Sequence, residues 1–172
     1  LKHSSDSDYV FVADWDSGLK AIDISTPGNP SLTATLATSG SSGTARGITL
    51  SADGDTLFVA DTNSGLKIVD IETPSDPSIT ATYSTNNAFD VELSGDNLFV
   101  ADHSSGLKII DVSTPSNPSL IGSYDTTGSA LGVALSTDGQ TAFVADADSG
   151  LQIIDVSNPS SPSLIGTYNT PD

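Results

Sequence analysis

The residues best suited to chemistry in this sequence form a short acidic loop, and that loop occurs four times. Its first copy reads DWDSG, with carboxylates at Asp14 and Asp16. Calcium binds six to eight oxygen atoms, and Asp-x-Asp or Asp-x-Asn spacing can direct two side-chain oxygens at one ion. The sequence therefore suggests calcium sites, and their candidate ligands are Asp14, Asp16, Asp61, Asn63, Asp102, Asp146 and Asp148.

A structural role explains the variation among these loops better. The Ser-Gly pair persists in all four copies, whereas the second acidic position becomes Asn63 in one copy and Ser104 in another. None of the loops has the distal glutamate of an EF-hand. An Asp that accepts hydrogen bonds from nearby backbone N–H groups, followed by a Gly with positive φ, makes a turn between two strands. We therefore expect turns and no cofactor, with calcium as the alternative.

A second acidic position also recurs, just before a proline-containing turn, at Asp23, Asp70, Asp111 and Asp155. General acid–base catalysis needs a group with its own surroundings, and four equivalent carboxylates do not provide one. We expect these residues to accept hydrogen bonds from the turn backbone. The two histidines lack the partner spacing of zinc sites, and no G-x-S-x-G elbow occurs. The sequence therefore predicts no catalytic residues and no enzyme activity.

One position of the acidic loop carries a ring in two copies, Trp15 and His103. An exposed aromatic side chain on a loop can contact a glycan or another protein. The alternative is that these rings pack against a neighbouring loop. We take Trp15 and His103 as the candidate binding surface.

The charge balance excludes several classes of partner. The 172 residues include 22 acidic and 5 basic side chains, a net charge of −17, which repels nucleic acid and anionic membranes. No apolar run approaches the roughly 20 residues of a membrane helix, so no membrane insertion is expected. Cysteine and methionine are absent, so the chain has no sulfur side chain to oxidise. This composition favours an extracellular or cell-surface location.

The acidic loops are regularly spaced along the chain. Their leading residues, Asp14, Asp61, Asp102 and Asp146, recur with a period of about 44 residues, as in proteins built from repeats. We treat the chain as one domain, 1–172, with units of about 1–44, 45–87, 88–129 and 130–172.

Each unit contains four short strand patterns, which in the second unit are 45–51, 56–60, 65–71 and 79–85. The second and third patterns are apolar on both faces, so we expect both faces to be covered. The fourth alternates apolar residues with Thr or Ser, as an exposed edge strand does. No segment shows helical periodicity. The pattern predicts an all-β protein made of β-propeller blades, with a sandwich of successive hairpins as the alternative.

The chain resembles the LVIVD-repeat family of β-propellers. The shared motif is F-V-A-D-x-x-S-G-L-x-I-[IV]-D-[IV]-[ST]-x-P-x-x-P-x-L, which recurs in all four units between Tyr9 and Thr170. The departures are small: Ala21-Ile22 replaces a pair of branched residues, and Asn158 replaces Thr. The resemblance implies a propeller of the kind found on bacterial and archaeal surfaces or among secreted proteins. It says little about the ligand, because propellers have many roles.

The first unit appears shorter than the others in its sequence pattern. Only Leu1-Lys2-His3 precedes the turn that should follow the innermost strand, so we expect the first blade to lack that strand. Incomplete repeat arrays expose apolar surface and unpaired strand edges. We therefore expect the chain to be part of a longer protein or of an oligomer that completes a larger ring. A monomer in which these three residues form a short strand is the alternative.

These observations favour a non-enzymatic scaffold for adhesion, for protein or glycan binding, or for self-assembly with further copies. A calcium-stabilised surface module is the second hypothesis. A third is a hydrolase with its site in the propeller channel, where Asp90 and Glu92 are the only acidic pair without equivalents in the other units.

Overall fold

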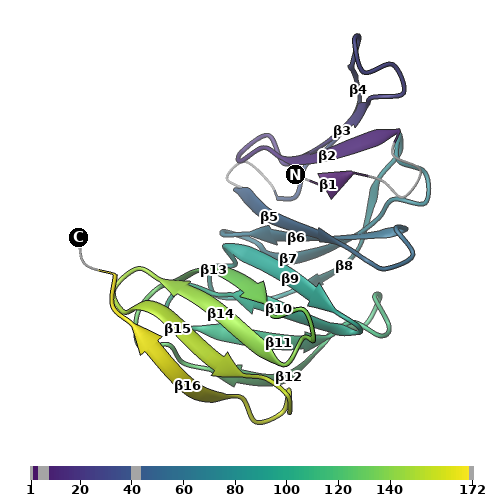
Figure 1. The fold of residues 1–172 in the computed structure, drawn as a ribbon. Helices are drawn as coiled ribbons and strands as arrows, with labels where there is room; N and C mark the ends of the chain where they lie inside the picture. Colours follow the sequence, from purple (N-terminus) through teal and green to yellow (C-terminus); the bar gives the residue numbers. More distant parts are fainter. Residues whose placement is uncertain (1, 4–7, 40–43, 171–172) are drawn as a thin grey trace.

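A computed structural model describes residues 2–3, 8–39 and 44–170 of the chain. These residues form sixteen strands in four antiparallel sheets of four strands each (Figure 1). Among the described residues there is no helix, and hence none long and apolar enough to cross a membrane. Each sheet corresponds to one predicted unit and is called a blade, numbered 1 to 4 along the chain.

The strands follow chain order from the innermost to the outermost in every blade. Blade 1 contains β1 (Lys2–His3), β2 (Tyr9–Ala13), β3 (Leu19–Asp23) and β4 (Ser31–Leu36). Blade 2 contains β5 (Ala45–Leu50), β6 (Thr56–Asp61), β7 (Gly65–Asp70) and β8 (Ser78–Tyr83). Blade 3 contains β9 (Asp90–Ser94), β10 (Asn97–Ala101), β11 (Leu107–Asp111) and β12 (Ser119–Tyr124). Blade 4 contains β13 (Ala130–Leu135), β14 (Thr141–Asp146), β15 (Gly150–Asp155) and β16 (Ser163–Tyr168).

The first blade differs from its prediction. Lys2 and His3 pair with Phe11 and Val10 of β2, so a two-residue strand occupies the innermost position where we expected none. The short strand that we considered as the alternative is present at Lys2–His3, whereas the expectation of a longer protein or an oligomer stays a prediction. The sequence pattern had no alternation to detect in so short a strand. Leu1 and the turn at Ser4–Ser7 lie outside the described residues.

Polar side chains hold the turn between the first two strands of blades 2 and 4. Between β5 and β6, the Asp53 carboxylate accepts hydrogen bonds from Ser51 Oγ at 2.5 Å and from the Asp55 N–H at 3.1 Å. The Ser51 hydroxyl, with help from the Asp55 N–H, holds the pKa of Asp53 below its ordinary value. Gly54 follows with a φ of 84°. This turn sets the register of β5 against β6, and Asp138 makes the same contacts in blade 4.

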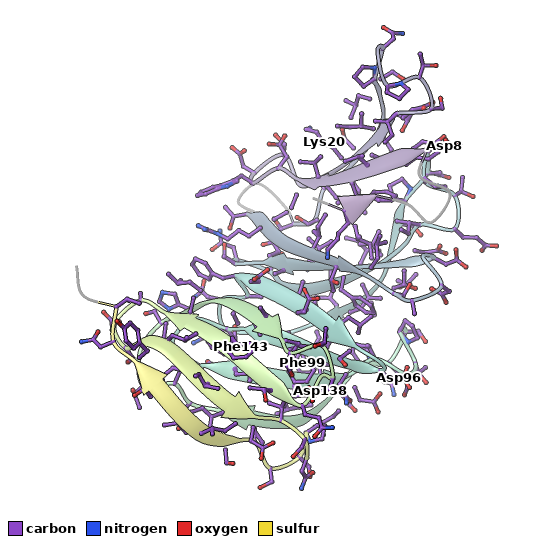
Figure 2. All side chains as sticks on the ribbon, viewed as in Figure 1. Asp8, Lys20, Asp96, Phe99, Asp138 and Phe143 are labelled. Carbon is purple, nitrogen blue, oxygen red and sulfur yellow. The ribbon has the colours of Figure 1, made fainter. Side chains whose placement is uncertain are left out.

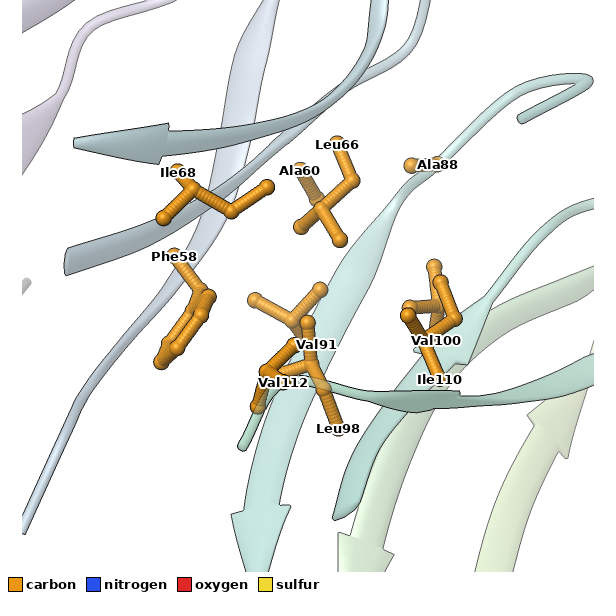
Figure 3. Close-up of a cluster of buried hydrophobic side chains, with 10 residues drawn as sticks. All are labelled: Phe58, Ala60, Leu66, Ile68, Ala88, Val91, Leu98, Val100, Ile110 and Val112. Carbon is orange, nitrogen blue, oxygen red and sulfur yellow. The ribbon is translucent and has the colours of Figure 1, made fainter. Parts of the chain in front are cut away.

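The hydrophobic core is divided among the contacts between successive blades, which we call joints. The joint between blades 2 and 3 is shown in Figure 3, with Phe58, Leu66 and Ile68 of blade 2 facing Leu98 and its neighbours in blade 3. Corresponding clusters fill the joints between blades 1 and 2 and between blades 3 and 4. Each joint packs one face of a blade against one face of the next, so the middle strands of blades 2 and 3 are covered on both faces, as predicted.

The four blades lie along an open arc, with their innermost strands gathered on its inner side (Figure 1). The Gly47 N–H of β5 donates to the Phe89 carbonyl, which precedes β9, at 3.1 Å. The outermost strands carry exposed apolar residues at one equivalent position, Leu32, Ile79, Leu120 and Leu164. The inner side of the arc and its loops are therefore the places where residues from different blades meet.

Candidate functional site

The leading Asp of the acidic loop is a buried structural acceptor in blade 2. Oδ1 of Asp61 accepts hydrogen bonds from the N–H groups of Asn63 at 3.1 Å and Ser64 at 3.1 Å. It also accepts one from the Thr44 N–H at 3.3 Å. Oδ2 accepts a hydrogen bond from Thr38 Oγ1, at the end of blade 1, at 2.6 Å. The carboxylate thus fixes the turn and ties two blades together.

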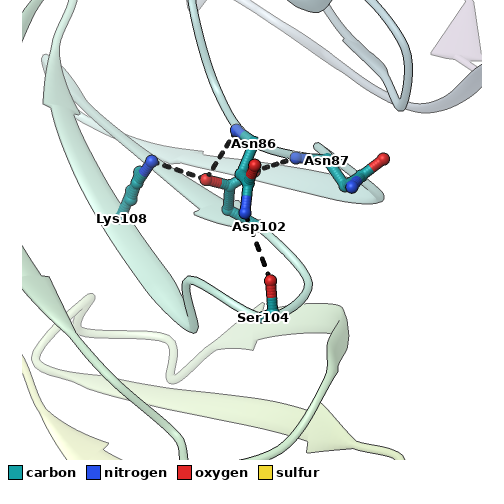
Figure 4. Close-up of polar contacts among 5 residues, drawn as sticks. All are labelled: Asn86, Asn87, Asp102, Ser104 and Lys108. Carbon is teal, nitrogen blue, oxygen red and sulfur yellow. Dashed lines mark hydrogen bonds and ion pairs between the residues drawn. The ribbon is translucent and has the colours of Figure 1, made fainter.

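Asp102 plays the same part in blade 3 with other partners (Figure 4). Its carboxylate accepts hydrogen bonds from the N–H groups of Asn86 at 3.1 Å and Asn87 at 2.7 Å. The Lys108 ammonium lies 2.6 Å from Asp102 Oδ2. The Asn86 side-chain amide donates to Ser104 Oγ at 3.2 Å. Both carboxylate oxygens therefore already have close partners from the chain itself.

The glycine of each loop is required by the same geometry. Gly65 has a φ of 81°, and a Cβ there would lie 2.5 Å from the Tyr83 carbonyl oxygen. Neither the conformation nor the space suits a side chain. This confirms the turn that the persistent Ser-Gly pair predicted.

The second members of three of the loops are exposed to solvent. Asp16, Asn63 and Asp148 are exposed, whereas Asp61, Asp102 and Asp146 are buried. Within 2–3, 8–39 and 44–170, no three His, Cys, Asp or Glu side chains gather as a metal site would require. Calcium binding stays an untested alternative, and the geometry that the described residues show is that of a turn.

The loops fall into two types that alternate along the chain, which the sequence analysis missed. In blades 1 and 3 the lysine on the third strand of the blade forms an ion pair with the leading Asp of the loop. In blade 1 this pair is Lys20 and Asp14, at 3.5 Å. In blade 2, Lys67 Nζ instead donates to the Ser64 carbonyl at 2.7 Å. In blade 4, Gln152 Nε2 donates to the Ser149 carbonyl at 3.0 Å. The sequence hinted at this alternation, because Gln152 in blade 4 replaces the lysine found at that position in the other three blades.

The second Asp series has the structural role that we expected. Each of the four carboxylates accepts a hydrogen bond from the N–H two residues later, at 2.8 to 2.9 Å. The side chain and the N–H of the serine two residues later hold the pKa values of Asp23 and Asp155 below their ordinary value, and the N–H and side chain of Ser113 do so for Asp111. None of the four differs from the others as a catalytic residue would.

The two candidate binding residues belong to one continuous stack, which we call the mouth stack: Trp15, Arg46, Phe89 and His103. The Arg46 guanidinium carbon lies 4.4 Å from the centre of the Trp15 ring and 4.3 Å from that of Phe89. The Phe89 ring is stacked on His103, with 5.3 Å between ring centres. The stack therefore crosses blades 1, 2 and 3 on the side of the arc that carries the acidic loops.

Backbone geometry holds the two ends of the mouth stack. Trp15 and His103 have positive φ angles of 45° and 47°, which are uncommon for residues other than glycine. The backbone of Trp15 exchanges hydrogen bonds with Ala45, at 3.2 and 3.1 Å, and that of His103 does so with Ala130. These bonds fasten each loop to the first residue of the next blade. Unusual backbone conformations persist where their surroundings support them, and they cluster at functional sites.

The mouth stack presents both an aromatic face and a cation. Trp15 is 57% exposed. Arg46 is the only arginine in the chain, and its Nε is buried with no hydrogen-bond partner in the described part of the chain. The sequence analysis missed Arg46 and Phe89, which share one position at the start of their blades, where blade 4 has Leu131. Arg46 could have been noticed in the sequence, because it is the one charged residue at a position that is otherwise apolar.

Asp90, the suspected channel residue, also bridges blades. Its Oδ2 accepts a hydrogen bond from the Val133 N–H of β13 at 3.1 Å, and its Oδ1 lies where a Cβ on Gly47 would be only 2.5 Å away. Burial raises the pKa of Asp90, while N–H groups of Val133 and Val91 and the charge of Lys2 oppose that rise. Glu92 is half-buried on the same strand. The carboxylate of Asp90 thus ties β9 to β13, and it leaves no room for a side chain at Gly47 of β5.

Four-stranded antiparallel blades packed face to face along an arc define a β-propeller architecture. The chain belongs to the LVIVD-repeat family: the LVIVD repeat matches it at residues 6–38, 42–85, 86–126 and 127–170. This confirms the resemblance and the predicted fold class. Among curated proteins, none matches the chain.

Solved structures agree on the fold. The β-propeller domain of Cps50 (Swd1) from Myceliophteria thermophila superposes with a TM-score of 0.79 at 18% identity, over 96% of this chain and 56% of that one. A protein assigned as a 6-phosphogluconolactonase from Bacteroides uniformis ATCC 8492 gives 0.82 at 16% identity, over 95% and 52%. A protein of unknown function from Desulfotomaculum acetoxidans DSM 771 gives 0.60 at 13% identity, over 98% and 69%. The chain spans about half the length of the first two, and these identities speak for the fold alone.

Proposed function

We propose that this chain is a non-enzymatic scaffold of an extracellular or cell-surface protein, and that it binds a protein or glycan ligand through the mouth stack. The observation that carries the proposal is the placement of the only arginine between two aromatic rings, 4.4 and 4.3 Å from their centres. Elsewhere the blades repeat one another closely. Arg46 has no basic counterpart, since the equivalent positions in blades 3 and 4 are Phe89 and Leu131.

The chemistry of the mouth stack favours a ligand with a flat apolar or sugar face and a carboxylate. Exposed aromatic rings bind sugar and apolar faces, and a guanidinium held in place can receive a carboxylate through two N–H groups. The net charge of −17 repels polyanions, but charges more than about 8 Å away are largely screened at physiological salt. Arg46 supplies a cation at this site, whereas Asp14, which is paired with Lys20, and the exposed Asp16 flank Trp15 in the chain.

Binding to an immobilised panel of acidic and neutral oligosaccharides and peptides tests the proposal. We expect the wild-type chain to bind some acidic members, and Trp15→Ala to weaken that binding at least about tenfold, the loss typical of a hot-spot aromatic. Leu32→Ala is the matched control, because Leu32 is 59% exposed but lies on the outermost strand of blade 1. Equal binding by Trp15→Ala and wild type would contradict the proposal.

A further inference from the structure

The mouth stack has the form of a row. Trp15 and His103 stand at its ends, with Arg46 and Phe89 between them, and the separations along it are 4.4, 4.3 and 5.3 Å. The Phe89 and His103 rings are 26° from parallel, so the stacking continues to the last ring. The two end rings belong to blades 1 and 3, which blade 2 separates. A ligand the size of one sugar therefore meets part of the row, whereas a linear chain of sugars can lie along it.

Every member of the mouth stack keeps part of its surface accessible. Trp15 is exposed, and Arg46, Phe89 and His103 are half-buried. Partly exposed rings that are held by neighbours offer an apolar face to a ligand at little further cost in conformational entropy. The row is therefore a surface that a ligand can reach along its length.

The two loops that carry rings also have their leading carboxylates paired with lysine. Asp14 lies 3.5 Å from Lys20, on β3 of blade 1 (Figure 2), and Asp102 lies 2.6 Å from Lys108. The corresponding side chains in blades 2 and 4, whose loops carry no ring, bond to loop carbonyls instead. An ammonium group next to a carboxylate reduces the repulsion that an acidic ligand meets there. Both ends of the mouth stack share this feature.

The two ends differ in their exposed charge. The exposed residue that follows Trp15 is Asp16, whereas the one that follows His103 is Ser104. The Ser104 hydroxyl accepts a hydrogen bond from the Asn86 side-chain amide at 3.2 Å. Within these two loops, an exposed acid adjoins only the Trp15 ring. The carboxylates of a ligand are therefore favoured between Arg46 and His103, and an uncharged ring face is favoured over Trp15.

The backbone at both ends favours a sugar chain over a peptide. Extended peptides commonly bind by adding a strand to a sheet edge, through main-chain hydrogen bonds. The backbone of Trp15 already exchanges hydrogen bonds with Ala45, and that of His103 does so with Ala130. The ends of the row thus present ring faces, and their main-chain groups are occupied.

We propose that the mouth stack binds a linear acidic oligosaccharide several sugars long, with a carboxylate at Arg46 and the chain continuing over Phe89 to His103. This inference rests on the binding role proposed above and adds the form of the ligand. It also assigns His103 as a ligand contact at the far end of the row. His103 touches the ligand only when the chain is long enough to reach it.

Titration calorimetry with a homologous series of uronic acid oligosaccharides, from monosaccharide to hexasaccharide, tests the proposal. Wild-type affinity should rise at least about tenfold with length and level off once the chain covers the row. His103→Ala should bind the hexasaccharide about two- to tenfold more weakly, the range for contacts between rings. It should bind the shortest member that gives measurable heat as the wild type does. A merely structural role of His103 would weaken short and long ligands alike.

His103→Trp should restore the affinity for the hexasaccharide. The same loop position holds Trp15 in blade 1, and the φ angles of 45° and 47° are nearly equal, so the loop accepts an indole. Leu120→Ala is the matched control, because Leu120 is 49% exposed on β12, the outermost strand of the blade that carries His103. It should bind every length as the wild type does. Melting curves check that the variants are folded, and the length dependence of the wild type needs no variant.

The outcomes separate this inference from the proposed function. Binding that Trp15→Ala weakens, but that depends neither on ligand length nor on His103, would overturn the extended site and leave the mouth stack as a site for a small acidic ligand. No binding of any length at millimolar concentration would overturn both. An acidic peptide of equal charge that binds as tightly as the hexasaccharide would overturn the choice of a sugar chain.

Discussion

Thr38 Oγ1 donates a 2.6 Å hydrogen bond to Asp61 Oδ2, and this bond joins the end of blade 1 to the acidic loop of blade 2. Both side chains are buried. The repeat places a threonine and an aspartate at these positions in the following joints as well, but within 2–3, 8–39 and 44–170 the hydroxyls of Thr85 and Thr126 are buried without a hydrogen-bond partner. The acidic loops thus hold the blades in order, and their carboxylates act as structural acceptors.

Removal of the Thr38 hydroxyl should destabilise the protein. Thr38→Val leaves Asp61 Oδ2 buried without its donor, which we expect to cost about 1–3 kcal/mol of unfolding free energy. Thr126→Val is the matched control, because Thr126 Oγ1 is buried with no partner among residues 2–3, 8–39 and 44–170. Urea unfolding of both variants measures the difference. Equal losses would mean that the Thr38–Asp61 bond contributes nothing of its own.

The alternation of loop types predicts opposite responses at two equivalent lysines. Lys108→Gln removes the cation 2.6 Å from the fully buried Asp102, and we expect a loss of about 1.5–3 kcal/mol, the range for hydrogen bonds to charged groups. Lys67→Gln should have little effect, because Gln152 makes the corresponding bond to a loop carbonyl in blade 4. Thermal and urea unfolding of the two variants measure both changes in stability. Equal effects of the two substitutions would contradict the alternation.

Asp90 should give the protein a recognisable pH dependence. Because burial raises its pKa in the folded state above the ordinary value of 3.8, the folded protein holds this proton more tightly than the unfolded chain does. The resulting stability is fully present below about pH 3.8 and is lost as the pH rises through the folded pKa. Wild type should therefore gain stability relative to Asp90→Asn as the pH falls from 7 to 4.

Urea unfolding of both proteins across this range measures the Asp90 effect, since the other carboxylates titrate alike in the two proteins and cancel. A constant difference in unfolding free energy would show that Asp90 has the same pKa folded and unfolded.

Calcium should leave the stability of the protein nearly unchanged. A ligand at 100 times its dissociation constant stabilises the folded state by about 2.7 kcal/mol, which a melting curve detects readily. The carboxylates of Asp61 and Asp102 already accept backbone and side-chain hydrogen bonds, so we expect no calcium-specific rise in melting temperature at millimolar concentration. Magnesium at equal ionic strength is the control for screening of the net charge. A rise with calcium alone would establish the calcium hypothesis.

The blades could be predicted because each of their strands and turns is determined by residues close together in the sequence. Alternation of side chains along a strand, the Asp53-Gly54 hairpin and the repeated Ser-Gly loops each fix structure within a few residues. The two-residue β1 could not be recognised, because Lys2 and His3 are too few to show a pattern. Their pairing with β2 depends on the edge which that strand presents.

The mouth stack could be predicted only in part. Trp15 and His103 stood out as rings in an otherwise polar loop, but Arg46 lies on β5 of blade 2 and Phe89 lies just before β9 of blade 3. Their meeting depends on the angle between neighbouring blades, which packing at the joints determines. The same reason explains why the bond from Asp90 of β9 to Val133 of β13 was not apparent from the sequence.

The fluorescence of Trp15, the only tryptophan of the chain, tests the proposed binding site most directly. Wild type is titrated with an oligosaccharide that ends in a uronic acid and, separately, with its neutral counterpart, and Arg46→Gln is titrated in parallel. The account predicts a saturable change in emission with the acidic ligand, and a binding constant at least about tenfold weaker for the neutral ligand and for Arg46→Gln, as expected when a charge-assisted pair is lost. Equal responses to the two ligands, or no response to either at millimolar concentration, would contradict it.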